Sequence, residues 1–88
     1  MKDRYLEVTF REGKPLAAYL HLPRTSGEKS ARSEKAGKGM IADFSAGGAM
    51  IGLEITAPSL ITVEDINAVL ERFGQPALAS EELSPLAA

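Results

Sequence analysis

The chain has 88 residues, of which 44% are hydrophobic and 25% charged, and its net charge is −2. This length allows one small domain, and the balance of residue types excludes a wholly disordered chain. The charge is unevenly distributed: residues 1–38 carry 9 basic and 5 acidic side chains (+4), and residues 39–88 carry 1 basic and 7 acidic side chains (−6). The small net charge of the whole chain gives no general attraction to polyanions or membranes.

Hydrophobic alternation predicts a first β-hairpin. Apolar side chains recur at every second position in residues 6–10 and again in residues 16–22, and a polar segment with Gly and Pro interrupts the pattern between them. For Phe10 to lie opposite Leu16, the loop must contain an odd number of residues, and Gly13 could form the bulge that this requires. Each strand would then have one apolar and one polar face.

Residues 24–38 are rich in Gly, Ser, Lys, Arg and Glu and almost lack apolar side chains. We expect an exposed connector, which could include a short edge strand near residues 30–35. Glu28 and Glu34 dilute its positive charge and it has no aromatic ring for stacking, so the pattern favours a solvated loop over nucleic-acid binding. The basic candidates for contact with nucleic acid or an acidic protein are Arg24, Lys29, Arg32, Lys35 and Lys38.

A second hairpin is predicted around the Gly47-Gly48 pair. A two-residue turn at these glycines places Phe44 opposite Ile51. The apolar side chains of residues 40–44 and 51–55 then all lie on one face, so register and hydrophobic pattern agree. The three predicted pairs are Phe44 with Ile51, Ala42 with Leu53, and Met40 with Ile55.

A C-terminal helix is predicted from Val63 to Phe73. Thr62 fits the N-cap, and Asp65 occupies the capping-box position three residues later. Apolar residues follow at helical spacing along one stripe, and Gly74 is placed to end the helix. This stripe is expected to pack on the apolar face of the sheet.

These elements predict an α+β fold, with an antiparallel four-stranded β-meander of two hairpins packed on one C-terminal helix and the short edge strand as a further element. Residues 1–74 would form a single domain. Residues 75–88 would form a tail that is either frayed or docked as a strap on a neighbouring subunit. The predicted core consists of Leu6, Val8, Phe10, Leu20, Leu22, Met40, Ala42, Phe44, Ile51, Leu53, Ile55, Val63, Ile66, Val69, Leu70 and Phe73.

No catalytic constellation is apparent in the sequence. The glycines match neither a phosphate-binding loop nor a dinucleotide-binding loop. His21 is the only histidine, so one chain cannot form a multi-histidine metal site, and its position between two leucines places it on the polar face of its strand. The absence of cysteine excludes disulfides, thiolate nucleophiles and Cys-ligated metals. We therefore expect a protein that is not an enzyme and that uses no cofactor and no metal.

The chain is expected to be cytoplasmic. Its first residues lack the apolar core of a secretion signal, and its longest apolar stretch, residues 49–53, is too short to span a bilayer. Contact with a membrane is not expected.

The polar side of the second hairpin carries two carboxylates. In the predicted register, Asp43 and Glu54 are diagonal neighbours roughly 7 to 8 Å apart. Such a pair could hold a water or a divalent cation, but an acid pair without a pocket is normally hydrated. Gly52 lies between them, and this flat, partly apolar surface suits another polypeptide better than a small substrate. The candidate residues of this interaction face are Tyr19, His21, Ile41, Asp43, Gly52 and Glu54.

Several segments contain strand motifs that recur in a family of small bacterial proteins. The segments are Leu16–Leu22, Ser30–Glu34, Gly39–Phe44 and Ile51–Ile55. They resemble the YuzE-like family, a domain of unknown function with an aspartate-ended strand, a turn and a Gly-(Ile/Leu)-Glu-Ile strand. The resemblance implies a compact antiparallel sheet with a helix, no established activity, and an antitoxin-like role, since some members are thought to lie beside small toxin-like partners. Leu16 and Arg11 stand where the family often has acidic residues, which removes carboxylates that a metal site would need.

Three functions are compatible with these features. The leading hypothesis is a non-catalytic protein-interaction module that forms a homodimer or binds a small partner protein. The second is nucleic-acid contact through residues 24–38. The third is a small metal or hydrolase-like site around Asp43, Glu54 and His21.

Overall fold

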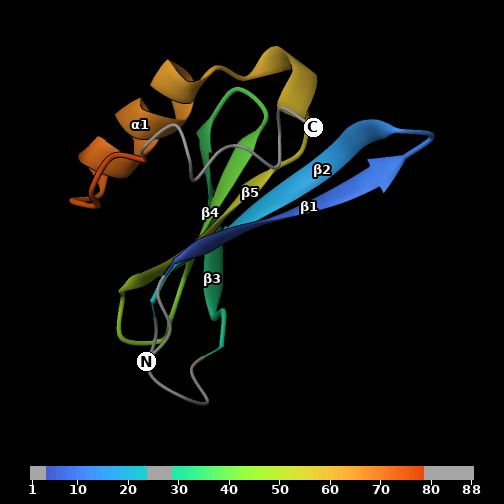
Figure 1. Ribbon diagram of the computed structural model, residues 1–88. Coiled ribbons are helices and arrows are strands. Elements are labelled where there is room, and N and C mark those ends of the chain that lie inside the picture. The colour runs from blue at the N-terminus through green and yellow to red at the C-terminus, as the bar shows by residue number, and fades with distance from the viewer. Residues whose placement is uncertain (1–3, 24–28, 79–88) are drawn as a thin grey trace.

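The computed structural model describes residues 4–23 and 29–78, and it is built from one antiparallel sheet and one helical layer (Figure 1). The sheet order is β1-β2-β5-β4-β3. A hairpin of β1 and β2 is therefore joined to a meander of β3, β4 and β5 by the pairing of β2 with β5. The elements are β1 (Tyr5–Arg11), β2 (Lys14–His21), β3 (Arg32–Gly37), β4 (Met40–Phe44), β5 (Met50–Ile55), the 3-10 turn η1 (Pro58–Leu60) and α1 (Val63–Arg72).

The predicted α+β class is confirmed, and the sheet has a fifth strand within the predicted connector. β3 covers Arg32–Gly37 and forms one edge of the sheet, whereas the connector was expected to be exposed loop with only a short strand near residues 30–35. Ala36 of β3 is buried and belongs to the same apolar cluster as Met40, on the helix side of the sheet. The hydrophobic pattern is weak here because an edge strand needs few apolar residues and is commonly protected by charges.

The first hairpin has the expected faces but a different turn. Val8 pairs with Ala18, as alternation requires, but Phe10 pairs with Pro15 and Leu16 is the extra residue of a bulge. The predicted pairing of Phe10 with Leu16 and the bulge at Gly13 are therefore wrong. Gly13 and the residue before it both have positive φ, 81° and 54°, which is the backbone of a two-residue type I′ turn. A turn of this type matches the right-handed twist of the two strands. The extra residue of the hairpin, Leu16, is therefore placed further along β2 and not in the turn.

The second hairpin follows the predicted register except next to its turn. Met40 pairs with Ile55, but Phe44 pairs with Met50, and Ile51 is left as the extra residue. The predicted pair of Phe44 with Ile51 is wrong because the connection is longer than two residues. The amide of Gly48 donates to the carbonyl of residue 45, and the amide of residue 45 donates to the carbonyl of residue 49, so five residues form the loop.

The core lies between the sheet and α1, where Ile66, Val69 and Leu70 of the helix pack on the apolar face of the strands. Phe10 and Val63 were predicted as core residues but are exposed, at 44% and 37%. Phe10 lies near the end of the β1–β2 hairpin, which extends beyond the helical layer (Figure 1), and Val63 is the first residue of the helix. Leu6, Val8 and Phe73 are only partly buried, and the core members that were not predicted are Ala18, Ala36, Met50 and Leu78.

The described part of the C-terminal tail, residues 75–78, is docked on the domain. The amide of Leu78 donates to Asn67 Oδ1 at 2.8 Å, and the Arg4 guanidinium donates to the carbonyls of residues 76 and 77 at 2.5 and 2.6 Å. Leu78 is buried as a result. The predicted strap or frayed end at residues 79–88 lies outside the described residues.

Both ends of α1 are closed by the residues that predict them. Thr62 Oγ1 accepts from the Asp65 amide at 3.1 Å, and Asp65 Oδ2 accepts from the Thr62 amide at 2.9 Å, which completes the capping box. At the other end, Gly74 has φ 76° and donates to Glu71, while Gln75 donates to Leu70, the pattern of a Schellman motif. The helix ends at Arg72, one residue before the predicted end.

We expect the capping box to make stability depend on pH in acid. The hydrogen bond from the Thr62 amide, and then that from its hydroxyl, lowers the pKa of Asp65 below its ordinary value of 3.8. Because the folded pKa is lowered, the stabilisation is complete above the unfolded pKa and is lost as pH falls through the folded pKa. Asp65→Asn should remove this part of the pH dependence in urea unfolding between about pH 2 and pH 5.

Thr62→Ala is the matched control for this experiment. It removes the hydroxyl but keeps the backbone amide, which is the larger cause of the lowered pKa, so most of the acid dependence should remain. Thr62→Ala should itself cost about 1 kcal/mol at neutral pH through the lost N-cap bond. An unchanged pH profile in Asp65→Asn would contradict the assignment.

Candidate interaction face

The face of the sheet opposite α1, here called the open face, carries two rows of side chains that cross all five strands. Side chains alternate along each strand, so the residues between the core positions lie on this face. Each row contains residues that are directly opposite one another on neighbouring strands. The first row is Tyr5, His21, Gly52, Asp43 and Ser33, and the second is Glu7, Tyr19, Glu54, Ile41 and Lys35.

A chain of hydrogen bonds runs across the middle of the open face. Tyr19 Oη donates to Asp43 Oδ2 at 2.7 Å, and Ser33 Oγ donates to Asp43 Oδ1 at 2.5 Å. The Tyr19 ring reaches Asp43 by lying directly on Gly52, since a Cβ added to Gly52 would be 1.9 Å from the phenol oxygen. The absence of a side chain at Gly52 is therefore what allows β2 and β4 to be bridged across β5.

His21 lies between two tyrosine rings on the same face. It stacks on Tyr5 with centroids 4.4 Å apart, and Tyr19 is tilted against it at 4.7 Å. Its Nε2 is 2.8 Å from Glu7 Oε1, and 26% of its side chain is exposed. The three rings therefore form a continuous, partly buried aromatic cluster along β1 and β2.

All six predicted interaction-face residues lie on the open face, where the structure adds further residues. Glu54 lies opposite Ile41 while Asp43 lies opposite Gly52, which makes the two carboxylates diagonal neighbours. Tyr5 and Glu7 were not among the six candidates, although pairing Val8 with Ala18 already places them opposite His21 and Tyr19. Ser33 and Lys35 had no such signal, because the short edge strand near residues 30–35 was predicted without a register or a partner strand.

The open face does not bring His21 and Ser33 together. His21 on β2 and Ser33 on β3 are separated by three strand spacings, about 14 Å, so they cannot exchange a proton directly. Both carboxylate oxygens of Asp43 already accept hydroxyl hydrogen bonds. Within residues 4–23 and 29–78, no group of three or more His, Cys, Asp or Glu side chains is placed to hold a metal ion.

The basic candidates of the connector are distributed over different surfaces. Arg32 lies on the helix side, with its guanidinium carbon 4.3 Å from the centroid of Phe44 and Nη1 2.5 Å from Glu34 Oε1. Lys35 is on the open face, and Lys38 is in the turn between β3 and β4. Lys29 is exposed before β3, and Arg24 lies outside the described residues. Strand alternation thus separates charges that are close together in the sequence.

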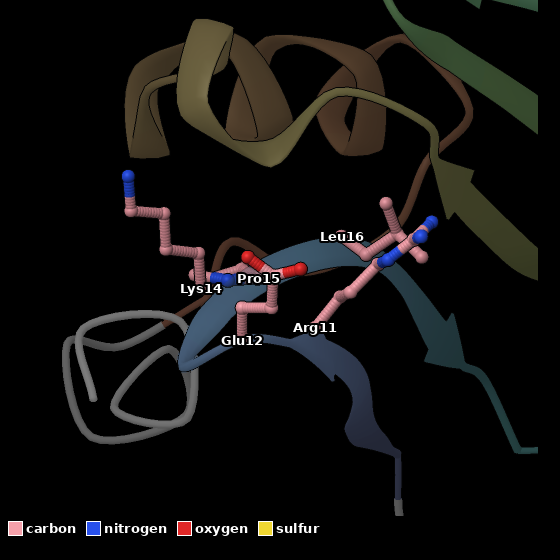
Figure 2. Close-up of a pocket in the computed structure, with 5 residues that line it drawn as sticks. All are labelled: Arg11, Glu12, Lys14, Pro15 and Leu16. Atoms are coloured by element: carbon pink, nitrogen blue, oxygen red, sulfur yellow. The ribbon is translucent and has the colours of Figure 1, made fainter.

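A pocket of about 280 Å³ lies at the tip of the β1–β2 hairpin (Figure 2). Arg11 and Lys14 give it positive charge, Glu12 adds one carboxylate, and Pro15 and Leu16 form its apolar part. The alternation of the strands gave no indication of this hollow, because it depends on the turn and on the bulge at Leu16. It lies further along the hairpin than the two rows of the open face.

The chain matches no protein family model, and comparisons with curated proteins and with solved structures give no significant match. In the described part of the chain, no helix has the length and apolar character needed to cross a membrane. The functional argument therefore depends on the geometry of the open face.

Proposed function

We propose that this chain is a non-catalytic protein-interaction module that binds a small, basic partner protein through the open face. One observation carries the proposal: α1 and η1 both lie on the other side of the sheet (Figure 1), while the open face carries three aromatic rings that pack against one another. Tyr19 is held by Asp43 and by Gly52 beneath it. Rings that are already ordered lose little entropy on binding, and tyrosine is enriched at protein interfaces.

The charge of the open face favours a basic partner. Within the two rows, Glu7, Asp43 and Glu54 contribute three carboxylates, against one lysine, Lys35. Complementary charge accelerates association and selects among partners more than it adds affinity. Because the rows lie on a sheet surface and the pocket lies at the hairpin tip, the face suits an extended polypeptide surface better than a small molecule.

The antitoxin-like role implied by the resemblance to the YuzE-like family is consistent with this proposal. An antitoxin-like role requires a surface that binds a small partner protein without catalysis. A sheet face with ordered aromatic residues and surplus carboxylates has the properties of such a surface.

The proposal predicts that charge reversal on the open face abolishes capture of the partner. Glu54 is half-buried in the second row, opposite Tyr19 and Ile41, so Glu54→Lys places a like charge at the centre of the contact. Glu71→Lys makes the same change on the exposed side of α1 and is the matched control. Tagged wild type and both variants would be used to capture proteins from a lysate of the source cells, in parallel samples with and without nuclease.

We expect wild type and Glu71→Lys to recover the same basic protein in stoichiometric amount, and Glu54→Lys to lose it at least roughly tenfold. Melting curves of the three proteins would show that each is folded. Capture that is unaffected by Glu54→Lys would contradict the proposal. Recovery of nucleic acid in samples without nuclease, with no protein retained after nuclease, would instead favour contact through residues 24–38.

A further inference from the structure

We propose that two copies of this chain pair along β1, antiparallel about a two-fold axis at Val8, and so join their sheets edge to edge. The inference goes beyond the proposed function, since it names a second copy of the chain as a further partner. It assigns that contact to the edge of the sheet and leaves the open face to the basic partner.

The two edges of the sheet differ in their protection against such pairing. β3 presents Arg32, Glu34 and Lys35, and its register is irregular between Lys35 and Gly37, features that disfavour the addition of another strand. β1 is seven residues long and alternates apolar and polar residues along its length. Among residues 4–23 and 29–78, its one strand neighbour is β2. An edge strand of this kind presents backbone donors and acceptors to a further strand.

The apolar side of β1 is incompletely covered by the described part of its own chain. Leu6 and Val8 are only partly buried at the margin of the core, and Phe10 is 44% exposed. The cause is the position of β1 at the sheet edge, on a hairpin that extends past the helical layer (Figure 1). A second β1 strand beside the first would cover these three side chains laterally.

The symmetric register pairs apolar residues with each other on the helix side and gives compatible pairs on the open face. With Val8 opposite the partner's Val8, Leu6 lies opposite the partner's Phe10, so the helix side of the junction is a continuous apolar row. On the open face, Tyr5 lies opposite the partner's Arg11, a pair suited to cation–π contact, and Glu7 lies opposite the partner's Thr9. All seven residues of both strands are paired.

The neighbouring registers are less favourable. A shift by two residues in one direction places Glu7 opposite the partner's Glu7, which is a direct repulsion between like charges. A shift in the other direction places Leu6 opposite the partner's Glu12 and Tyr5 opposite the partner's Gly13, which are turn residues and not strand residues. Shifts by an odd number exchange the faces and would set apolar side chains against polar ones.

Because the chain has no cysteine, single introduced cysteines report the register directly. In the proposed dimer the two Cα atoms at position 8 are about 4.5 to 5.5 Å apart, within reach of a disulfide. Val8→Cys of the full chain should therefore form a disulfide-linked dimer under mild oxidation. In the same register, position 9 lies opposite the partner's position 7 and two residues away from the partner's position 9. Thr9→Cys should therefore cross-link far less.

A second pair of variants tests the contact without cross-linking. Phe10→Lys introduces a charge into the apolar row, whereas Leu60→Lys makes the same kind of change at a residue that is 62% exposed on η1. In sedimentation equilibrium, wild type and Leu60→Lys should be dimers, and Phe10→Lys should raise the dimer dissociation constant roughly tenfold or more.

The inference is overturned if the wild type sediments as a monomer over the whole concentration series. It is also overturned if Thr9→Cys cross-links as readily as Val8→Cys, or if Phe10→Lys leaves dimerisation unchanged. These results are independent of the proposed function, which is judged by partner capture with Glu54→Lys. A chain that is monomeric but captures the basic protein would refute the edge dimer alone, and a dimer without that capture would refute the open-face proposal alone.

Discussion

Leu53→Asp is expected to unfold the domain. Leu53 is fully buried at the centre of the sheet, where β5 lies between β2 and β4 and its neighbours are Leu20 and Ala42. An ionised carboxylate at this site would be buried without a partner, and the apolar burial of the leucine would be lost as well. A domain of this size has a total stability of only about 5 to 15 kcal/mol, so the combined penalty exceeds what it can tolerate.

Circular dichroism and thermal unfolding would measure this effect. Leu53→Ala should retain the fold with a loss of about 2 to 5 kcal/mol, because it leaves a cavity but no charge. Leu60→Asp makes the same chemical change as Leu53→Asp at an exposed leucine and should alter stability by less than about 0.5 kcal/mol. A Leu53→Asp protein with the melting temperature of the wild type would refute the assignment of the sheet faces.

Gly52→Ala should destabilise the protein through a residue on a neighbouring strand. The added Cβ would lie 1.9 Å from Tyr19 Oη and 2.3 Å from its Cζ, so the tyrosine ring must leave its place above Gly52. The hydrogen bond from Tyr19 to Asp43 would then be lost together with the ring contacts. We expect a cost of about 1 to 3 kcal/mol in urea unfolding.

A double-mutant cycle separates this cause from an intrinsic effect of alanine. In a Tyr19→Ala background the three atoms nearest to the added Cβ are absent, and alanine is better suited than glycine to a strand, so Gly52→Ala should become neutral or slightly stabilising there. Gly47→Ala is a control, because its Cβ would meet nothing closer than 3.9 Å. Additivity of Gly52→Ala and Tyr19→Ala within about 0.5 kcal/mol would show that the two residues are not coupled.

The features that could be predicted from the sequence are those set by local chemistry. The Thr62–Asp65 capping box starts the helix at Val63, and Gly74, two residues beyond its last residue Arg72, terminates it, as their side chains and backbone preferences require. The pairing of Ala42 with Leu53 follows from alternation of period two along each strand. The same alternation places Asp43, Gly52 and Glu54 on the polar face, since only the parity of their positions is needed.

The two errors of register have a common physical origin. Phe10 and Ile51 each lie next to a turn where the chain inserts one extra residue on one strand, and the hydrophobic pattern does not record on which strand or at which position this happens. The exposure of Phe10 has a further cause, since it depends on how far the hairpin extends beyond α1. That distance is a property of the packed molecule.

The amino-acid sequence was enough to predict the α+β class, the start of the helix at Val63, its end to within one residue, and the face on which the candidate residues of the two hairpins lie. The pairing of β2 with β5 could not be predicted in this way, and this pairing brings Tyr19 onto Gly52 and within reach of Asp43. The same is true of the position of Ser33, which completes the chain of hydrogen bonds from an edge strand. The physical reason is that turns, caps and alternation involve residues near in sequence, whereas the order of strands is selected by the burial of the whole apolar surface at once.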